Sequence, residues 1–261
     1  MSKDPLMSQD PLMSQDPLMS QDPVMSQSTR LTIVIPCYNE AKNIPLILKR
    51  FQEVTTRGDI KLLLVNNGSR DDSAEVLAAE IPKFPFAESL LVPVNQGYGY
   101  GILQGLAACK TDYLGWTHAD MQTDPKDIVR AMEVLEKANF PTNMYVKGQR
   151  RGRPLSDSFF TGGMSVFESL YLGTSLWDIN AQPNIFHRSF YETWTAPPQD
   201  FALDLYVYYT AMQENLNLVR IDVIFPERLH GQSNWNTGFN SKVKFIKRTL
   251  DFSVKLKKTF K

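Results

Sequence analysis

From residue 31 onward, short apolar runs alternate with stretches that have a helical period. Short runs rich in branched and aromatic side chains predict buried strands. We expect such strands at residues 31–35, 61–65, 89–94, 113–115 and 220–225, with a further strand ending in residues 145–153. Because strands that alternate with helices form parallel units, the pattern predicts an α/β fold in which helices flank a Rossmann-like, mostly parallel central sheet.

The segment after the first strand carries the usual signals of helix boundaries. Asn43 is placed to cap a helix, Pro45 suits its first turn, and Gly58 is expected to end it. Ile47 and Leu48 give this helix an apolar face toward the sheet.

The N-terminus is a sequence repeat. Residues 1–27 repeat a hexapeptide of the form MSQDPL, and each full copy carries a proline. Proline removes a backbone donor and disfavours helix at the residue before it, so we expect a disordered tail at residues 1–29. The folded domain is then expected at residues 30–240, and a basic tail at residues 241–261.

The basic tail alternates lysines with apolar residues, as in the run from Lys244 to Leu250. An amphipathic basic helix of this kind suits an anionic membrane surface. The alternative is a helix that packs on the domain and leaves its lysines in water.

Composition narrows the class of protein. The chain has 261 residues, a formal net charge of +0 and 43% hydrophobic residues, which fits one globular domain with tails and gives no sign of a nucleic-acid partner. Cys37 and Cys109 lie in apolar segments, so we expect reduced thiols in the core. No apolar run is long enough to span a bilayer and no signal peptide is evident, so we expect a cytoplasmic protein, soluble or peripheral at the inner face of the membrane.

A polar loop follows each of the first four predicted strands. These loops are residues 36–40, 66–73, 95–101 and 116–125. Ligands bind at the carboxyl ends of strands in open α/β sheets, so we expect the loops to share one edge. Gly97, Gly99 and Gly101 make the third loop resemble a phosphate-binding loop, although no dinucleotide or P-loop pattern is met. Close passage of the backbone past a neighbouring strand would require the same glycines.

The fourth loop places His118 and Asp120 two residues apart. On an extended backbone both side chains would point to the same side, where an imidazole and a carboxylate can hold a divalent ion against a ligand's phosphates. The alternative is a polar loop in which Asp124 and Pro125 open the next helix.

Four motifs together resemble a known family. They are Ile35–Glu40, Val65–Ser69, Asn95–Gly99 and His118–Gln122, in this order. Over roughly residues 31–236 the chain resembles the family 2 glycosyltransferases, which have the GT-A fold, and within them the polyprenyl-phosphate sugar synthases and bacterial cell-surface polysaccharide transferases. The resemblance implies inverting transfer of a sugar from a nucleoside-diphosphate sugar, assisted by Mg²⁺ or Mn²⁺, to a lipid-phosphate or glycan acceptor.

The resemblance also implies roles for residues of the first three loops. Pro36, Tyr38 and Glu40 match the loop that lies along the donor nucleotide. Asn67 matches a nucleotide-binding carboxylate, and Gly97 belongs to the third motif. The usual Asp-Asp-Gly-Ser is Asn66-Asn67-Gly-Ser here, which keeps the shape of the turn but loses its charge.

The metal motif departs from the family in one position. His118 stands where the family has aspartate, which leaves Asp120 as the carboxylate ligand and Gln122 as a helper. Because hard Mg²⁺ prefers oxygen ligands, an imidazole here favours Mn²⁺.

The second half of the chain is expected to form the acceptor side. Its basic cluster consists of Lys147, Arg150, Arg151 and Arg153. Guanidinium groups clamp phosphate oxygens, so we expect the cluster to face phosphate rather than form a merely solvated face. Asp178 and Asn180 match the family segment beside the donor site, where they would bind sugar hydroxyls or shape a turn. Residues 164–172 predict an amphipathic helix, packed on the core or lining a groove for a lipid tail.

Two further motifs complete the resemblance. Asp204 lies in an apolar helical segment and matches the family's late acidic residue, the general base when the acceptor is a hydroxyl; a paired structural acid is the alternative. Arg228, His230 and Ser233 match an Arg-x-x-Gly-x-Ser loop that approaches the donor pyrophosphate.

Two other functions stay open on sequence grounds. A degenerate nucleotide-sugar-binding protein would explain the replacement of carboxylates by His118, Asn66 and Asn67. A nucleotidyltransferase would use a related sheet, but the glycine-rich Arg-Lys loop of such enzymes does not follow the first strand.

Overall fold

The computed structural model describes residues 29–152, 155–225 and 249–258. The strands are β1 (Leu31–Cys37), β2 (Ile60–Asn67), β3 (Ala87–Val92), β4 (Tyr113–Trp116), β5 (Met144–Arg151), β6 (Asn184–His187) and β7 (Asn217–Ile224). The helices are α1 (Ile44–Val54), α2 (Ser73–Glu80), α3 (Tyr98–Ala108), α4 (Lys126–Lys137), α5 (Leu155–Leu172), α6 (Arg188–Glu192) and α7 (Leu203–Gln213), with a 3-10 turn, η1 (Ile81–Lys83). Residues 249–258 form a further helix, here called the C-terminal helix.

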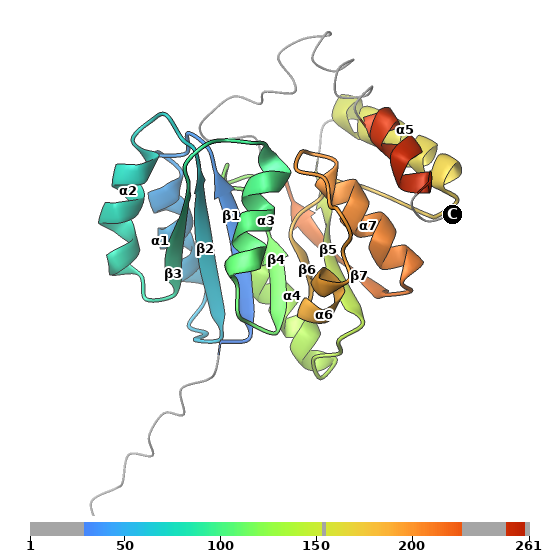
Figure 1. Ribbon diagram of the computed structural model, residues 1–261. Coiled ribbons are helices and arrows are strands. Elements are labelled where there is room, and N and C mark those ends of the chain that lie inside the picture. Colours follow the sequence, from blue (N-terminus) through green and yellow to red (C-terminus); the bar gives the residue numbers. More distant parts are fainter. Residues whose placement is uncertain (1–28, 153–154, 226–248, 259–261) are drawn as a thin grey trace, which may run out of the picture.

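One seven-stranded sheet runs through the molecule in the order β3-β2-β1-β4-β6-β5-β7 (Figure 1). The pairs β1–β2, β2–β3, β1–β4 and β5–β7 are parallel, whereas β6 runs antiparallel to both β4 and β5. The predicted mostly parallel sheet is therefore confirmed, and one reversed strand, β6, lies inside it.

Helices cover both faces of this sheet. Apolar side chains of α1, α2 and α4 pack on one face, for example Leu48, Leu77 and Met132. Those of α3, α6 and α7 pack on the other, for example Leu106 and Leu205. Both cysteines are buried and free, as expected.

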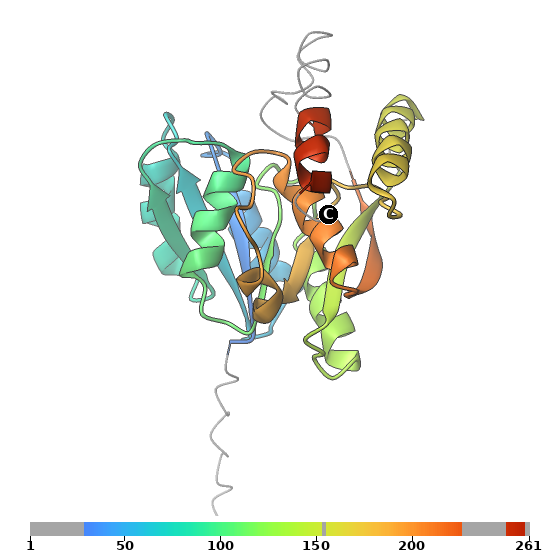
Figure 2. The same cartoon turned by 45° about the vertical axis from the view of Figure 1, so that its right-hand side comes forward.

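The C-terminal helix lies beside α5, away from the centre of the sheet (Figures 1 and 2). Ser253 Oγ donates a buried hydrogen bond to Glu168 Oε2 at 2.7 Å, and Lys257 Nζ donates to Tyr171 O. The described part of the basic tail is thus helical and packed on the domain, in line with the alternative weighed above. Within the described residues, no helix has the length and apolar character needed to cross a membrane.

Several boundaries differ from the sequence expectations. Asn43 makes no side-chain cap, because its Nδ2 instead donates to Glu40 Oε2 at 2.6 Å. Helix α1 ends at Val54, before Gly58, because Thr55 takes an extended backbone (φ −143°, ψ 140°). Pro45 lies in the first turn, as expected. The repeat tail and most of the basic tail lie outside the described residues.

Candidate functional site

The loops after β1 and β2 are joined by hydrogen bonds at one edge of the sheet. The backbone N–H of Asn39 donates to Ser69 Oγ at 3.1 Å, and that of Glu40 donates to Ser73 Oγ at 3.0 Å. A cavity of about 380 Å³ lies between these loops. Its lining residues are Asn39, Glu40, Ala41, Lys42, Asn43, Asp71 and Asp72. Glu40, one of the three residues expected along the nucleotide, therefore lines the cavity. Pro36 and Tyr38, which come shortly before it in the chain, are half-buried.

The two asparagines after β2 have different tasks. Asn66 Oδ1 accepts from the backbone N–H of Ser69 at 3.1 Å and shapes the turn. Asn67 is 3% exposed, and its Nδ2 donates to Gly97 O at 2.9 Å. A carboxylate has no hydrogen to donate to a carbonyl, so this contact gives a physical reason for an amide at position 67. Whether Asn67 binds a nucleotide stays a prediction.

The glycine-rich segment at the start of α3 lies against the segment that precedes α7. Gly97 has φ +124°, a backbone conformation that other residues rarely adopt. A Cβ added at Gly99 would lie 2.7 Å from Asp200 O and 2.8 Å from Pro198 O. Tyr100 N also donates to Gln199 O at 2.8 Å. Close passage of a neighbouring backbone therefore accounts for Gly97 and Gly99, and phosphate binding by this segment stays a prediction.

The loop after β4 bends instead of continuing the strand, so the expected extended arrangement of His118 and Asp120 is wrong. Met121 takes φ +59°, and Asp120 Oδ1 accepts from the backbone N–H of Gln122 at 3.1 Å. Asp120 is 5% exposed, and His118 is half-buried with its ring 5.9 Å from that of Tyr98. Both potential ligands thus come from one bend at the edge of the sheet.

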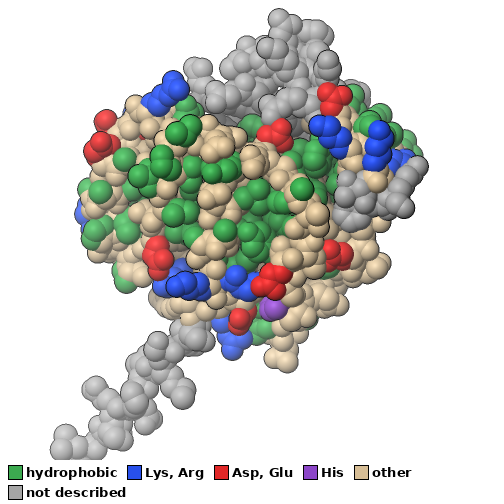
Figure 3. Space-filling model, in the orientation of Figure 1, with side chains coloured by type: hydrophobic (Ala, Val, Ile, Leu, Met, Phe, Trp, Pro, Cys, Tyr) green, Lys and Arg blue, Asp and Glu red, His purple; other side chains and the backbone are tan. Residues whose placement is uncertain are grey.

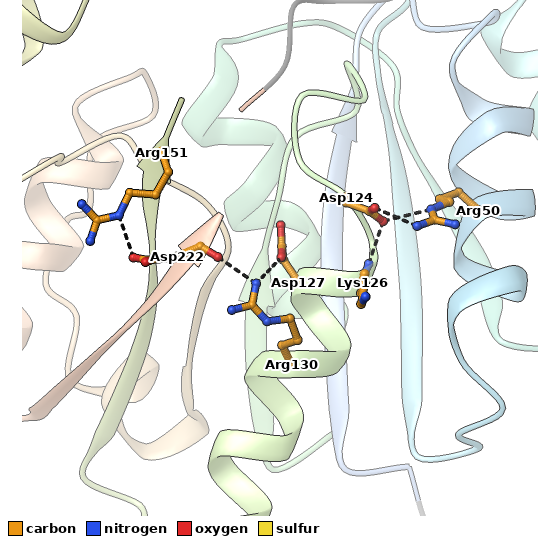
Figure 4. A network of polar contacts seen from close by, with 7 residues as sticks. All are labelled: Arg50, Asp124, Lys126, Asp127, Arg130, Arg151 and Asp222. Carbon is orange, nitrogen blue, oxygen red and sulfur yellow. Dashed lines mark hydrogen bonds and ion pairs between the residues drawn. The ribbon is translucent and has the colours of Figure 1, made fainter. Parts of the chain in front are cut away.

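The end of this loop opens α4, as the alternative interpretation proposed. Asp124 Oδ1 accepts from the backbone N–H of Lys126 at 3.0 Å, and its carboxylate pairs with Arg50 of α1 at 2.8 Å (Figure 4). Asp124 is therefore a structural acid that ties α4 to α1.

The donor atoms near Asp120 suit an open metal site rather than a closed one. In the part of the chain that the structure describes, no group of three or more His, Cys, Asp or Glu side chains could hold a metal ion. Mg²⁺ and related ions are often held by one or two carboxylates together with substrate phosphates. Asp120, with His118 and the half-buried Gln122, fits that requirement if a diphosphate supplies the remaining oxygens.

Asp204, at the start of α7, is 2% exposed and has partners that the sequence did not reveal. Its Oδ1 accepts from Gln182 Nε2 at 2.8 Å and from Asn184 Nδ2 at 3.1 Å. Burial raises the pKa of Asp204, and the charges of Lys147 and His118 oppose that rise. The acid is hence buried and hydrogen-bonded, and it lies near enough to His118 for the charge of that residue to affect its pKa.

The described members of the basic cluster, Lys147, Arg150 and Arg151, do not form a free phosphate-binding face. Lys147 is 0% exposed, and burial lowers its pKa to about 7. Side chains of a strand point alternately to the two faces of the sheet, and that of Lys147 points to the face covered by α7. The prediction that Lys147 belongs to the phosphate-facing cluster is therefore wrong. Arg151 Nε donates to Asp222 Oδ1 at 2.9 Å (Figure 4).

Arg150 and Asp178, which sequence reasoning assigned to different ligands, bind each other. Asp178 Oδ1 accepts from Arg150 Nε at 2.8 Å, and its Oδ2 accepts from the Arg150 backbone N–H at 2.8 Å. Burial alone would raise the pKa of Asp178, but Arg150 outweighs it and holds the pKa below its usual value. Asn180 is half-buried two residues further on.

Four predicted site residues lie outside the residues whose side chains the structure describes. They are Arg153, Arg228, His230 and Ser233. The residues that sequence reasoning missed are Gln182, Asn184, Tyr98 and Tyr145. A glutamine and an asparagine on either side of Pro183, within an apolar segment, were the available signal.

Comparison with known proteins agrees with this geometry. The sequence model of "Glycosyl transferase family 2" matches residues 32–195, well over half of the chain. The chain belongs to this family. Its GT-A fold is confirmed by solved glycosyltransferase structures that share the same architecture.

Curated relatives carry the name undecaprenyl-phosphate 4-deoxy-4-formamido-L-arabinose transferase. That of Pseudomonas fluorescens (strain Pf0-1) is 36% identical over 131 residues, covering 48% of this chain and 37% of the relative. That of Photorhabdus laumondii is 27% identical over 216 residues, covering 79% of this chain and 63% of the relative. This family 2 chain thus spans only part of the length of these relatives.

Solved structures match at lower identity. Glucosyl-3-phosphoglycerate synthase of Mycobacterium tuberculosis, solved with Mn²⁺, UDP and glucosyl-3-phosphoglycerate, has a TM-score of 0.65 at 14% identity and covers 88% of this chain and 80% of its own. A mannosyltransferase of Pyrobaculum calidifontis, solved with GDP-Man and Mn²⁺, has a TM-score of 0.64 at 16% identity, with 87% and 65% covered. At these identities the likeness shows the fold.

Proposed function

We propose that this family 2 glycosyltransferase moves a sugar from a nucleoside-diphosphate sugar to a polyprenyl phosphate or a cell-surface glycan, with inversion. The observation that carries the proposal is the convergence of the loops bearing Glu40, Asn67 and Asp120 at one edge of the sheet, with Asp204 beneath them. The names of the curated relatives support the acceptor, and the ligands of the solved neighbours support the donor.

In this proposal the residues of the first half bind the donor. Pro36, Tyr38 and Glu40 lie along the nucleotide, and Asn67 and Gly97 close its other side. Asp120, His118 and Gln122 would hold Mn²⁺ or Mg²⁺, which when bound offsets the charge of the departing diphosphate. Arg228, His230 and Ser233 are proposed to approach the same diphosphate.

The bond from the anomeric carbon to the diphosphate breaks as the acceptor oxygen bonds to that carbon from the opposite face. A lipid phosphate is already ionised at neutral pH and needs no base. A glycan hydroxyl must lose its proton, and Asp204 is proposed to accept it. Asp178 and Asn180 would then shape the acceptor side, with Arg150 held in place by Asp178 and Arg153 nearby in sequence.

A lipid acceptor calls for a peripheral membrane contact, proposed at the inner face of the membrane. Helix α5 presents Val166 (52% exposed), Phe167 (43%) and Leu170 (79%) along one stripe to solvent. Lys255 and Lys258 are exposed on the adjacent C-terminal helix. Figure 3 shows hydrophobic and basic side chains, together with an acidic one, at the upper right, where these helices lie. An apolar stripe beside lysines fits an anionic lipid surface.

This contact is tested by sedimentation with vesicles of anionic and of neutral lipid. Replacing Leu170 by Gln removes the most exposed apolar side chain, and Leu91→Gln, at a residue 64% exposed on β3, is the matched control. We expect Leu170→Gln to weaken binding to anionic vesicles by about fivefold, because burying part of a leucine contributes about 1 kcal/mol. Equal binding by the wild type and both variants would place the contact elsewhere.

The proposed transfer is tested first by ligand binding. Because a ligand bound by the folded state raises the melting temperature, UDP-, GDP- and dTDP-sugars are compared with Mn²⁺, with Mg²⁺ and with neither. The stabilising donor is then offered, with its sugar labelled, to undecaprenyl phosphate and to a glycan. Transfer of label supports the proposal; donor binding without transfer to either favours a nucleotide-sugar-binding protein. Release of pyrophosphate from a nucleoside triphosphate and a sugar phosphate would favour a nucleotidyltransferase.

A further inference from the structure

A chain of buried polar side chains links β5, β6 and α7 under the candidate site. Lys147 Nζ donates to Asn184 Oδ1 at 2.8 Å and to Ala181 O at 2.8 Å. Asn184 Nδ2 donates to Gln182 Oε1 at 2.6 Å and to Asp204 Oδ1 at 3.1 Å. Lys147, Gln182, Asn184 and Asp204 are between 0% and 2% exposed, so water does not compete for these contacts.

The direction of these hydrogen bonds follows from the chemistry of Lys147. In its protonated form Lys147 has only hydrogens to offer, so the atom of Asn184 that faces it is the amide oxygen. Tyr145 OH donates to the same oxygen. With its oxygen held by two donors, the Asn184 amide must turn its Nδ2 hydrogens toward Gln182 and Asp204.

The orientation of the Asn184 amide fixes that of the Gln182 amide. Its Oε1 accepts from Asn184, so its Nε2 is left to donate, and it does so to Asp204 Oδ1 at 2.8 Å and to Tyr98 OH at 3.3 Å. Two amide hydrogens therefore meet on one oxygen of Asp204. Hydrogen bonds to a carboxylate favour its charged form and restrict its rotation.

We propose that Lys147 is a positioning residue, which acts through Asn184 and Gln182 to hold the Asp204 carboxylate in the orientation needed to accept the acceptor's proton. This inference rests on the proposed function, because it requires Asp204 to act as a base. Lys147 itself does not reach the reacting atoms, since it is enclosed in the core. A purely structural lysine would fill the same space without controlling which way two amides point.

The neighbouring strand offers a control for the loss of a basic side chain on this face of the sheet. Arg220 of β7 pairs in register with Lys147, and both cations lie over the ring of Tyr208, at 5.6 Å and 5.5 Å from its centroid. Arg220 takes no part in the amide chain. Arg220→Met and Lys147→Met therefore each remove a basic side chain from over Tyr208, and only Lys147→Met releases Asn184.

The test measures kcat and KM for transfer to a hydroxyl acceptor. Lys147→Met should lower kcat about 10- to 100-fold, the size of loss found when an outer partner of a functional group is removed, and should leave the donor KM within about twofold. Arg220→Met should leave kcat unchanged. In an Asp204→Asn background, Lys147→Met should cause no further loss, because its action passes through Asp204.

A second variant keeps the test decisive if Lys147→Met fails to fold. Asn184→Asp retains an oxygen for Lys147 and Tyr145 but cannot donate to Asp204, and it should lower kcat by a similar factor. An unchanged kcat in both variants, an equal loss in the Asp204→Asn background, or the same loss in Arg220→Met would overturn the inference. Failure of the proposed function would give a different result, because the wild type itself would then transfer no sugar.

Discussion

The two halves of the sheet bury different chemistry. In β3, β2, β1 and β4 the strands bury chiefly apolar side chains, such as Ile33, Leu64 and Trp116, and polar groups begin where the strands end. In β6 and β5 the strands themselves bury Asn184 and Lys147, close to Asp204 of α7. The first half is a scaffold that carries polar loops, whereas the second half has polar groups built into its core. Changes in the first half should thus alter binding with little effect on stability, and changes in the second half should alter both.

Asp120→Asn should have the largest effect. An amide cannot supply the negative charge that holds a divalent ion against two phosphates, so transfer should fall below detection. The melting temperature without ligand should stay unchanged, because an amide oxygen can still accept from Gln122 N. A loss of transfer smaller than about 10²-fold, the lower end of what one catalytic group contributes, would remove Asp120 from the metal site.

Asp204→Asn, on α7 beside the second half of the sheet, should change both the rate of transfer and the stability of the fold. With a hydroxyl acceptor kcat should fall about 10²- to 10⁴-fold, the usual contribution of a general base. Folding raises the pKa of Asp204, so above the unfolded pKa the ionised carboxylate lowers the stability of the folded state. Asp204→Asn removes this charge and should therefore melt at a higher temperature at pH 7. As the pH is lowered, the wild-type rate should begin to fall at a higher pH than it would if Asp204 had the ordinary pKa of an aspartate.

With a lipid phosphate as acceptor, the same variant should retain its rate, because no proton has to be removed. Rates measured with both acceptors therefore separate the two versions of the proposed reaction. Equal loss with both would assign Asp204 a structural part instead.

Gly99→Ala tests the seam where the two halves meet. The added methyl would lie within 2.8 Å of three backbone atoms of residues 198–200, so we expect a loss of about 1–3 kcal/mol in the free energy of unfolding. Gly163→Ala in α5 is the control, since nothing lies within 4 Å of its Cβ position, and it should stabilise the helix by about 0.5–1 kcal/mol. Denaturant unfolding measures both, and equal stability of the two variants would argue against the close approach.

His118→Asp should have the smallest effect. An oxygen ligand in place of nitrogen should shift the ratio of rates with Mn²⁺ and Mg²⁺ toward Mg²⁺ by a few-fold. A ligating imidazole must be neutral, and its ordinary pKa is about 6.5, so the wild type should also lose metal affinity in mild acid more steeply than the variant. An unchanged metal preference and acid sensitivity would show that His118 is not a ligand.

The same contrast explains which features the sequence could predict. Strands of the first half are recognisable because apolar runs such as 31–35 and 61–65 end abruptly in polar residues, and their shared edge follows from parallel pairing. The sequence places Lys147 in the cluster expected to face phosphate, because no local feature indicates that a lysine among arginines points into the core. The partners of Asp204 lie 20 and 22 positions away in the chain, on β6 and just before it, so only the fold brings them together. The bend at Met121 likewise depends on backbone geometry that residue types do not reveal.

The contact between Tyr100 N and Gln199 O has a consequence for how the molecule opens. It joins the glycine-rich first turn of α3 to the segment that leads into α7. A buried amide exchanges its hydrogen with solvent only when the structure around it opens. The Tyr100 amide should therefore exchange together with those of α7. The loop proposed to bind the donor and the helix that carries Asp204 then open as one cooperative unit.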